Sequence, residues 1–207
     1  MITLDFLATV VLLSASGALS PGPLFLASTL RAAKHGGQAG IECAIGHTLV
    51  EFPLVIGLTV GLQTILQSLT DLIAVTGGMV LLVFASVQLL QASRRIELDS
   101  KKLPSFWDKR PGIIAGLVFT ALNPFFILWW VTVGTTLTKQ ALALGAIAGV
   151  LAMFAAHIWM DYAWLGGTAI LAARGRLILG RLYRVLLVIF SLVMIYFGVS
   201  FIFSAIL

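Results

Sequence analysis

Long apolar runs separated by short polar segments extend along the whole chain. The runs predict six helices, at residues 4–30, 41–66, 72–90, 112–136, within 141–173 and at 182–207. Each run has about the 20 residues that a helix needs to cross the roughly 30 Å hydrocarbon core of a bilayer. The hydrophobic pattern therefore predicts an all-α membrane protein with six transmembrane helices.

The composition supports this prediction. Apolar residues make up 60% of the 207 positions and charged residues 10%, whereas a soluble domain carries about 25% charged residues. The first twenty residues contain Asp5 and no basic residue, so we expect residues 4–19 to be part of a retained helix and not a cleaved signal peptide. Cys43 is the only cysteine, which excludes an intrachain disulfide and argues against a membrane thiol oxidoreductase.

Basic residues gather in three of the predicted loops. Twelve of the thirteen are found there: Arg31 and Lys34 in the first loop, Arg94, Arg95, Lys101, Lys102, Lys109 and Arg110 in the third, and Arg174, Arg176, Arg181 and Arg184 in the fifth. Cytoplasmic loops carry the excess of Lys and Arg. These loops are therefore predicted to be cytoplasmic, and the even number of spans places both termini outside the cytoplasmic membrane. A nucleic-acid partner is not expected, because no basic face with interleaved aromatics lies elsewhere.

The six predicted spans divide into two groups of three. Residues 1–92 form the first group, residues 93–111 a basic cytoplasmic loop, and residues 112–207 the second group. Three spans reverse the direction of the chain, so the two groups would be inverted repeats in the membrane. Such repeats are typical of secondary transporters, whose substrate sites lie between the repeats near the bilayer midplane.

Each group opens with a span that proline interrupts. The interruptions consist of Ser20, Pro21, Gly22 and Pro23 in the first span and of Asn123 and Pro124 in the fourth. Proline removes one backbone hydrogen bond from a helix, and in lipid the freed carbonyl needs a neighbouring helix, a hydroxyl or water as its partner. Two breaks at corresponding positions predict a shared cavity with broken-helix walls. The alternative is a pair of kinks that only improve packing.

Two histidine–acid pairs lie within the predicted spans, His47 with Glu51 in the second and His157 with Asp161 in the fifth. Residues four apart share a helix face, and ionisable residues in membrane helices usually face a cavity, a partner or an ion path. Such a pair can carry a proton near neutral pH, since an unperturbed imidazole titrates at about 6.5. Two imidazoles and two carboxylates also form a credible ligand set for a divalent metal. The sequence does not choose between these functions, and a structural pair is the third alternative.

Tryptophans cluster in the second half of the chain. Trp129, Trp130, Trp159 and Trp164 belong to the fourth and fifth predicted spans. Tryptophan is enriched at membrane interfaces, and its large ring also suits the wall of a cavity. Both placements are therefore open.

Three motifs together resemble the LysE/RhtB family of amino-acid exporters. They are the Ser-Pro-Gly-Pro of residues 20–23, the stretch from Gly46 to Glu51, and Asn123-Pro124. The resemblance covers nearly the whole chain in length, span count and motif order. The chain has Val50-Glu51 where family members commonly have Gly-Asp, and Phe125 where a lysine often follows Asn-Pro.

The resemblance implies a secondary transporter that exports amino acids or related small solutes, coupled to a proton or another ion gradient. The predicted substrate-binding and coupling residues are Ser20, Pro21, Gly22, Pro23, His47, Glu51, Asn123, Pro124, His157 and Asp161. Glu51 would accept the ammonium of a zwitterion, while backbone N–H groups or His47 would bind its carboxylate. The alternative is a divalent-metal exporter with both histidine–acid pairs as ligands.

The resemblance implies transport without ATP hydrolysis, and the chain has no Gly-x-x-x-x-Gly-Lys-Ser/Thr loop for a nucleotide phosphate. Neither enzymatic activity nor a cofactor is expected of such a transporter. The expected partners are the lipid bilayer, a small-molecule substrate and a coupling ion, with the proton as the first candidate. A homo-oligomer is left open. A membrane scaffold without transport activity would leave the buried ionisable groups unexplained.

Overall fold

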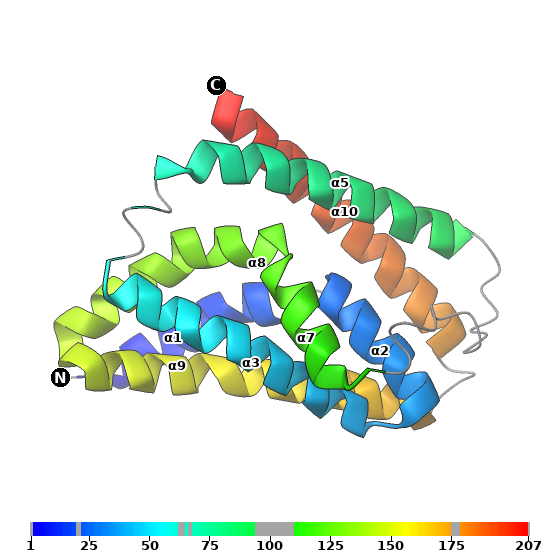
Figure 1. The fold of residues 1–207 in the computed structure, drawn as a ribbon, viewed down its shortest axis with the longest axis horizontal. Coiled ribbons are helices and arrows are strands. Elements are labelled where there is room, and N and C mark those ends of the chain that lie inside the picture. The colour runs from blue at the N-terminus through cyan, green and yellow to red at the C-terminus, as the bar shows by residue number, and fades with distance from the viewer. Residues whose placement is uncertain are drawn as a thin grey trace.

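The computed structural model describes residues 2–19, 22–61, 65, 68–93, 110–174 and 179–206, and all regular elements in these residues are helical (Figure 1). The elements are α1 (Leu4–Ala18), α2 (Pro23–His35), α3 (Gln38–Thr59), α5 (Thr70–Ser93), α7 (Gly112–Ala121), α8 (Pro124–Trp129), the π-helix η2 (Trp130–Gly134), α9 (Thr135–Arg174) and α10 (Leu179–Ile206). The predicted all-α class is confirmed for this part of the chain.

Two stretches among the described residues are long and apolar enough to cross a membrane, Gln38–Thr59 and Phe125–Arg174. A third is the pair α1 and α2, which qualifies if its members are counted as one span bent by 71°. Shorter apolar helices cover Ala74–Val83, Gly112–Ala121 and Ser191–Phe203. Length and composition thus identify two to three candidate spans, and the total of six stays a prediction.

The long stretch Phe125–Arg174 is not one straight helix. Gly145 and Ala146 leave the helical conformation, and Ala146 has a φ of 50°. A Cβ atom on Gly149 would collide with the carbonyl oxygen of Ala141, although residues eight apart in a continuous helix are separated by about 12 Å. The chain therefore folds back at Gly145–Ala146, and Figure 1 shows two arms that run in opposite directions.

Both proline motifs coincide with breaks between helices. Gly22 precedes α2 with an extended backbone, and Pro23 occupies the first turn of the helix. Asn123 occupies the same position before α8, where its Oδ1 accepts a hydrogen bond of 3.1 Å from the backbone N–H of Phe125. Proline suits the start of a helix because its missing N–H would have no partner there. Ser20 and Pro21 lie outside the described residues.

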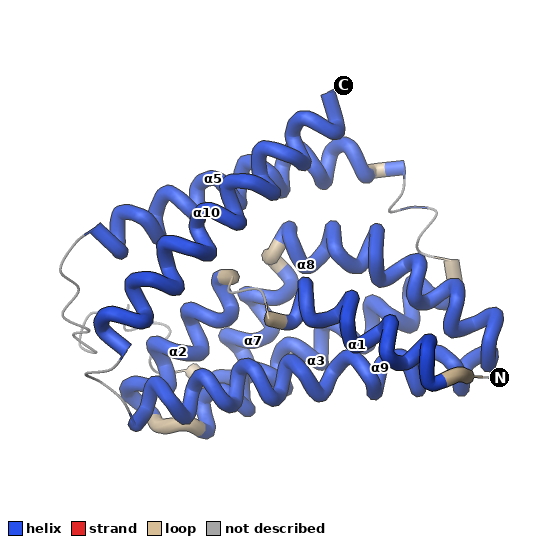
Figure 2. Tube along the Cα trace, turned by 180° about the vertical axis from the view of Figure 1, so that it is seen from behind, coloured by secondary structure: helices blue, strands red, loops and turns tan. Residues whose placement is uncertain are grey.

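The helices form two packed groups. α3 lies against α7 and α9, and α9 also contacts α1 and α2, so these helices build the main body. α5 and α10 pack along each other and contact the main body chiefly through α8 (Figure 2). Both groups meet at α8, which begins directly after the break at Asn123.

The crossing of α3 and α7 depends on glycine. A Cβ atom on Gly46 would collide with the carbonyl oxygen of Ile113, and one on Gly116 with that of Cys43. Small residues allow helix backbones to approach closely in membranes, where packing replaces the hydrophobic effect between helices. This contact holds the second predicted span against the fourth.

We expect Gly46→Ala to lower the apparent melting temperature of the detergent-purified protein. The added methyl group overpacks the crossing, which costs about 1–3 kcal/mol. Gly167→Ala is the matched control, because a Cβ atom at Gly167 would meet no heavy atom within 4 Å, and alanine is about 1 kcal/mol more favourable than glycine in a helix. Equal melting temperatures for the two variants would contradict the close crossing.

Candidate substrate and ion site

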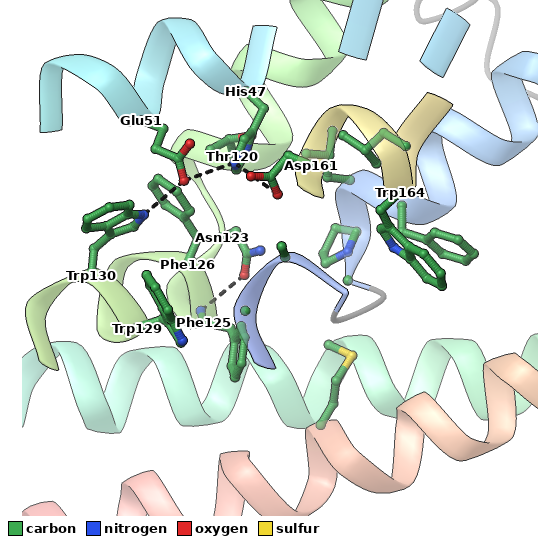
Figure 3. A pocket seen from close by; sticks show the side chains of 18 of the residues that line it. His47, Glu51, Thr120, Asn123, Phe125, Phe126, Trp129, Trp130, Asp161 and Trp164 are labelled. Atoms are coloured by element: carbon green, nitrogen blue, oxygen red, sulfur yellow. Dashed lines mark hydrogen bonds and ion pairs between the residues drawn. The ribbon is translucent and has the colours of Figure 1, made fainter. Parts of the chain in front are cut away.

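A cavity lies between the helix breaks, the middle of α3 and α9, and the α5–α10 pair. The space among its lining side chains, including the part that opens outward, is about 800 Å³. Seven of the predicted site residues line it: Gly22, Pro23, His47, Glu51, Asn123, His157 and Asp161. Figure 3 shows Glu51, His47 and Asp161 together on one wall.

The Glu51 carboxylate is the centre of this polar wall. Its side chain is only 1% exposed, and its Oε1 lies 3.0 Å from Nε1 of Trp130, 3.0 Å from Nε2 of His157 and 3.2 Å from Nε2 of His47. An ionised carboxylate only accepts hydrogen bonds, so all three rings donate to an ionised Glu51. Three donors on one oxygen offset much of the cost of burying the charge.

The second oxygen of Glu51 has a different environment. Oε2 is buried without a hydrogen-bond partner among the residues that the structure describes, and so is Nδ1 of His157. Buried polar atoms are normally paired, and exceptions in native proteins often mark functional groups. Both residues line the cavity.

His47 is held so that it can gain or lose a proton. Its Nδ1 lies 2.9 Å from the hydroxyl of the buried Thr120. A hydroxyl both donates and accepts. Thr120 can therefore donate to Nδ1 of the neutral ring and accept from Nδ1–H of the charged ring, and His47 keeps a partner in both states.

Asp161 joins the two predicted pairs into one cluster. Its Oδ1 lies 3.7 Å from Nε2 of His47, and its Oδ2 lies 3.4 Å from Nε2 of His157. His47 belongs to α3, and His157 and Asp161 belong to α9. The structure thus brings together two pairs that are more than 100 positions apart in the sequence.

The π-helix η2 places Trp130 on Glu51. A π-turn contains one more residue than an α-turn and often occurs at functional sites. Thr135 stabilises it by donating from its hydroxyl to the carbonyl of Trp130 at 3.0 Å. Gly134 leaves room for the indole, since a Cβ atom there would overlap the Trp130 ring.

Aromatic side chains form much of the remaining wall. Trp129 lies against His157 with ring centroids 5.4 Å apart, and Trp164 stacks on Phe25 at 5.6 Å. Of the four tryptophans that could lie at a membrane interface or in a cavity wall, Trp129, Trp130 and Trp164 line the cavity. Trp159 is 53% exposed and donates to the carbonyl of Ala156 in its own helix.

The two helix breaks meet at the cavity. A Cβ atom built on Gly22 would lie 3.5 Å from Nδ2 of Asn123, and both residues line the space. Pro124 begins α8 directly after Asn123. Sequence reasoning did not find Thr120 or Phe126, which also line the cavity. Thr120 was a detectable signal, as a polar residue in an apolar run three positions before Asn123.

The same cluster has the composition of a cation site. His47, Glu51 and Asp161 each offer a ligand atom, and these atoms lie within 4.8 Å of one another. Ligands at about 2.0–2.2 Å from a tetrahedral ion would be separated by roughly 3.5 Å. The three atoms could reach such an ion after small side-chain shifts.

These features define a class of protein, a helical membrane transporter with a cavity between broken helices. The family model described as LysE type translocator matches residues 15–205. The chain belongs to this family, whose members are transporters and not enzymes. No match was found among curated proteins or among solved structures.

We expect Trp130→Phe to destabilise the protein, because it removes one of three donors to the buried Glu51 carboxylate. A hydrogen bond to a charged group contributes about 1.5–3 kcal/mol. Trp159→Phe is the matched control, since its exposed ring should change stability by less than about 0.5 kcal/mol. Thermal unfolding in detergent measures both variants, and a Trp130→Phe protein as stable as the control would exclude Trp130 as a support of Glu51.

Proposed function

We propose that this chain exports amino acids or related small solutes across the cytoplasmic membrane in exchange for protons. The observation that carries the proposal is the buried cluster of two carboxylates and two imidazoles in the cavity wall, beside the meeting point of two helix breaks. Discontinuous helices and ionisable groups at one cavity are the usual elements of secondary transporters.

The cavity can bind both charges of an amino acid. Oε2 of Glu51 has no hydrogen-bond partner in the described part of the chain and can accept from the substrate ammonium. The start of α2 lies at the same cavity, and Gly22 provides no side-chain cap for the helix N–H groups. Uncapped N–H groups and the helix dipole favour a carboxylate at this end.

Coupling to protons follows from the charge of the cluster. With Glu51 and Asp161 ionised, each proton on His47 or His157 raises the net charge of the four groups by one. A substrate ammonium adds the same charge at the same place. Substrate and proton therefore compete for one set of carboxylates, which favours exchange over simultaneous binding.

Six spans in two inverted repeats fit the helix contacts. If the two groups of three spans are repeats, each contact in one group should have a counterpart after the groups are exchanged. The contact of α3 with α7 then corresponds to the contact of α9 with α1 and α2, while the α5–α10 and α3–α9 contacts each correspond to themselves. The last turns of α2 and α9 and the first turns of α7 and α10 gather at one end in Figure 1. These ends border the three basic loops, which supports their common cytoplasmic location.

Export of a divalent metal is the second candidate. It is favoured by the three ligand atoms of His47, Glu51 and Asp161 within 4.8 Å of one another, and imidazole and carboxylate ligands suit Zn²⁺ and related ions. The aromatic and aliphatic lining of the rest of the cavity favours an organic solute instead.

The first test of function is thermal stabilisation of the purified protein by a panel of amino acids and a panel of divalent cations. A ligand at 100 times its dissociation constant adds about 2.7 kcal/mol to the folded state. We expect an amino acid to raise the melting temperature of the wild type but not of Glu51→Gln, which removes the negative charge that attracts the ammonium.

Asp71→Asn is the matched control, because Asp71 is an exposed acid at the start of α5, outside the cavity. It should keep the full response. Stabilisation by Zn²⁺ or another divalent ion alone would replace the amino-acid proposal with metal export. Stabilisation of Glu51→Gln equal to that of the wild type would remove Glu51 from the site.

Single-cysteine labelling tests the six-span orientation. Replacing Cys43, the only cysteine, with alanine provides the background. A cysteine at Thr3 or Lys139 should react with an impermeant maleimide in intact cells, and a cysteine at Lys34 or Arg110 only after permeabilisation. Labelling of Lys34→Cys from outside would invert or overturn the predicted topology.

A further inference from the structure

The ionisable side chains of the described residues lie on one wall of the cavity only. Its ionisable lining residues are Glu51, Asp161, His47 and His157, which all belong to α3 or α9. The other described residues that line the cavity include no Lys, Arg, Asp or Glu. An ionised side chain can therefore hold a substrate from this wall only.

The opposite wall is apolar and belongs to the α5–α10 pair. Leu81 of α5 and Met194 of α10 line the cavity and are only 2% and 6% exposed. Phe197 lines it from the same side and packs on their cluster. These side chains contain no hydrogen-bonding group apart from the weakly accepting thioether of methionine.

Phe125 connects this wall to the helix break. Its backbone follows the Asn123-Pro124 break at the start of α8, and its ring contacts Phe197 with centroids 5.4 Å apart. Figure 3 shows Phe125 on the far side of the cavity from Glu51. The end of the cavity opposite the carboxylates is thus closed by aromatic and aliphatic groups.

We infer that the preferred substrates are α-amino acids with one ammonium group and a large apolar or aromatic side chain, such as leucine and phenylalanine. This inference rests on the proposed function and narrows it. The ammonium lies at Glu51 and Asp161, and the side chain lies against Leu81, Met194 and Phe197. Apolar surface gains free energy when it leaves water for such a wall.

The same wall acts against amino acids with charged side chains. The second ammonium of lysine or the side-chain carboxylate of glutamate would lose water without gaining a partner there, and burial of an unpaired charge is strongly unfavourable. Alanine would bind without burying an unpaired charge, but its small side chain would bury little of the apolar wall. Differences of one or two methylene groups in an apolar pocket correspond to about tenfold or more in specificity.

Counterflow into proteoliposomes tests this inference on the purified full chain. Vesicles loaded with unlabelled phenylalanine take up labelled phenylalanine, while leucine, alanine, lysine or glutamate competes from outside. We expect leucine to compete at least about tenfold better than alanine, and lysine and glutamate to compete more weakly than alanine. Parallel sets loaded and labelled with lysine or with glutamate show whether amino acids with charged side chains are carried instead.

Two substitutions in the apolar wall sharpen the test. Phe197→Ala should weaken competition by leucine and phenylalanine by about tenfold and leave alanine unchanged. Phe203→Ala is the matched control, because Phe203 is on the same helix and is 61% exposed. Met194→Glu places a carboxylate in the apolar wall and should improve competition by lysine over leucine.

The outcomes separate the inference from the proposed function. Exchange of lysine or glutamate in preference to leucine would overturn the apolar-substrate inference and leave amino-acid export intact. Absence of exchange in all sets, with no amino acid stabilising the protein against heat, would overturn both. Equal loss of every substrate in Phe197→Ala and none in Phe203→Ala would show that Phe197 supports the fold and not specificity, which also contradicts the inference.

Discussion

The structure depends on keeping the Glu51 carboxylate inside an apolar helix bundle. A buried charge is tolerated only when donors surround it, and here three ring N–H groups from three different segments converge on one oxygen. Each donor requires its own local arrangement. Trp130 needs the π-helix, His157 needs the chain reversal at Gly145–Ala146, and His47 lies four residues before Glu51 on α3, where Thr120 of α7 holds its other ring nitrogen. The polar cluster and the helix packing therefore stabilise each other.

Incomplete pairing gives this cluster its function in the proposed mechanism. A fully paired set of buried charges would only support the fold, whereas Oε2 of Glu51 and Nδ1 of His157 have no hydrogen-bond partner among the described residues and belong to residues that line the cavity. The Thr120 hydroxyl allows His47 to change its charge without losing its partner. In the proposed mechanism, His47 can therefore release its proton when a substrate ammonium binds and still keep its hydrogen bond to Thr120.

The sequence predicted which residues belong to the site but not that the two histidine–acid pairs form one cluster. His47 with Glu51, and His157 with Asp161, were visible because ionisable residues are rare in apolar runs and a spacing of four marks one helix face. The proline motifs marked the helix breaks for the same kind of local reason. The meeting of both pairs on Glu51 depends on α3 packing against α9, and no local pattern encodes that contact. Trp130 could not be assigned either, because its position depends on an extra residue in the π-turn.

The apolar wall shows most clearly what only the assembled fold reveals. Leu81 and Met194 are ordinary residues of membrane helices, and nothing in their sequence neighbourhood separates them from residues that face lipid. They become cavity residues because α5 and α10 pair and are held over the broken end of α8 through Phe125. In the proposed function, the charge that attracts a substrate therefore comes from α3 and α9, while the surface that selects its side chain comes from α5 and α10. Because these two groups of helices contact each other chiefly through α8, selectivity can change by substitution in α5 and α10 without disturbing the buried carboxylates.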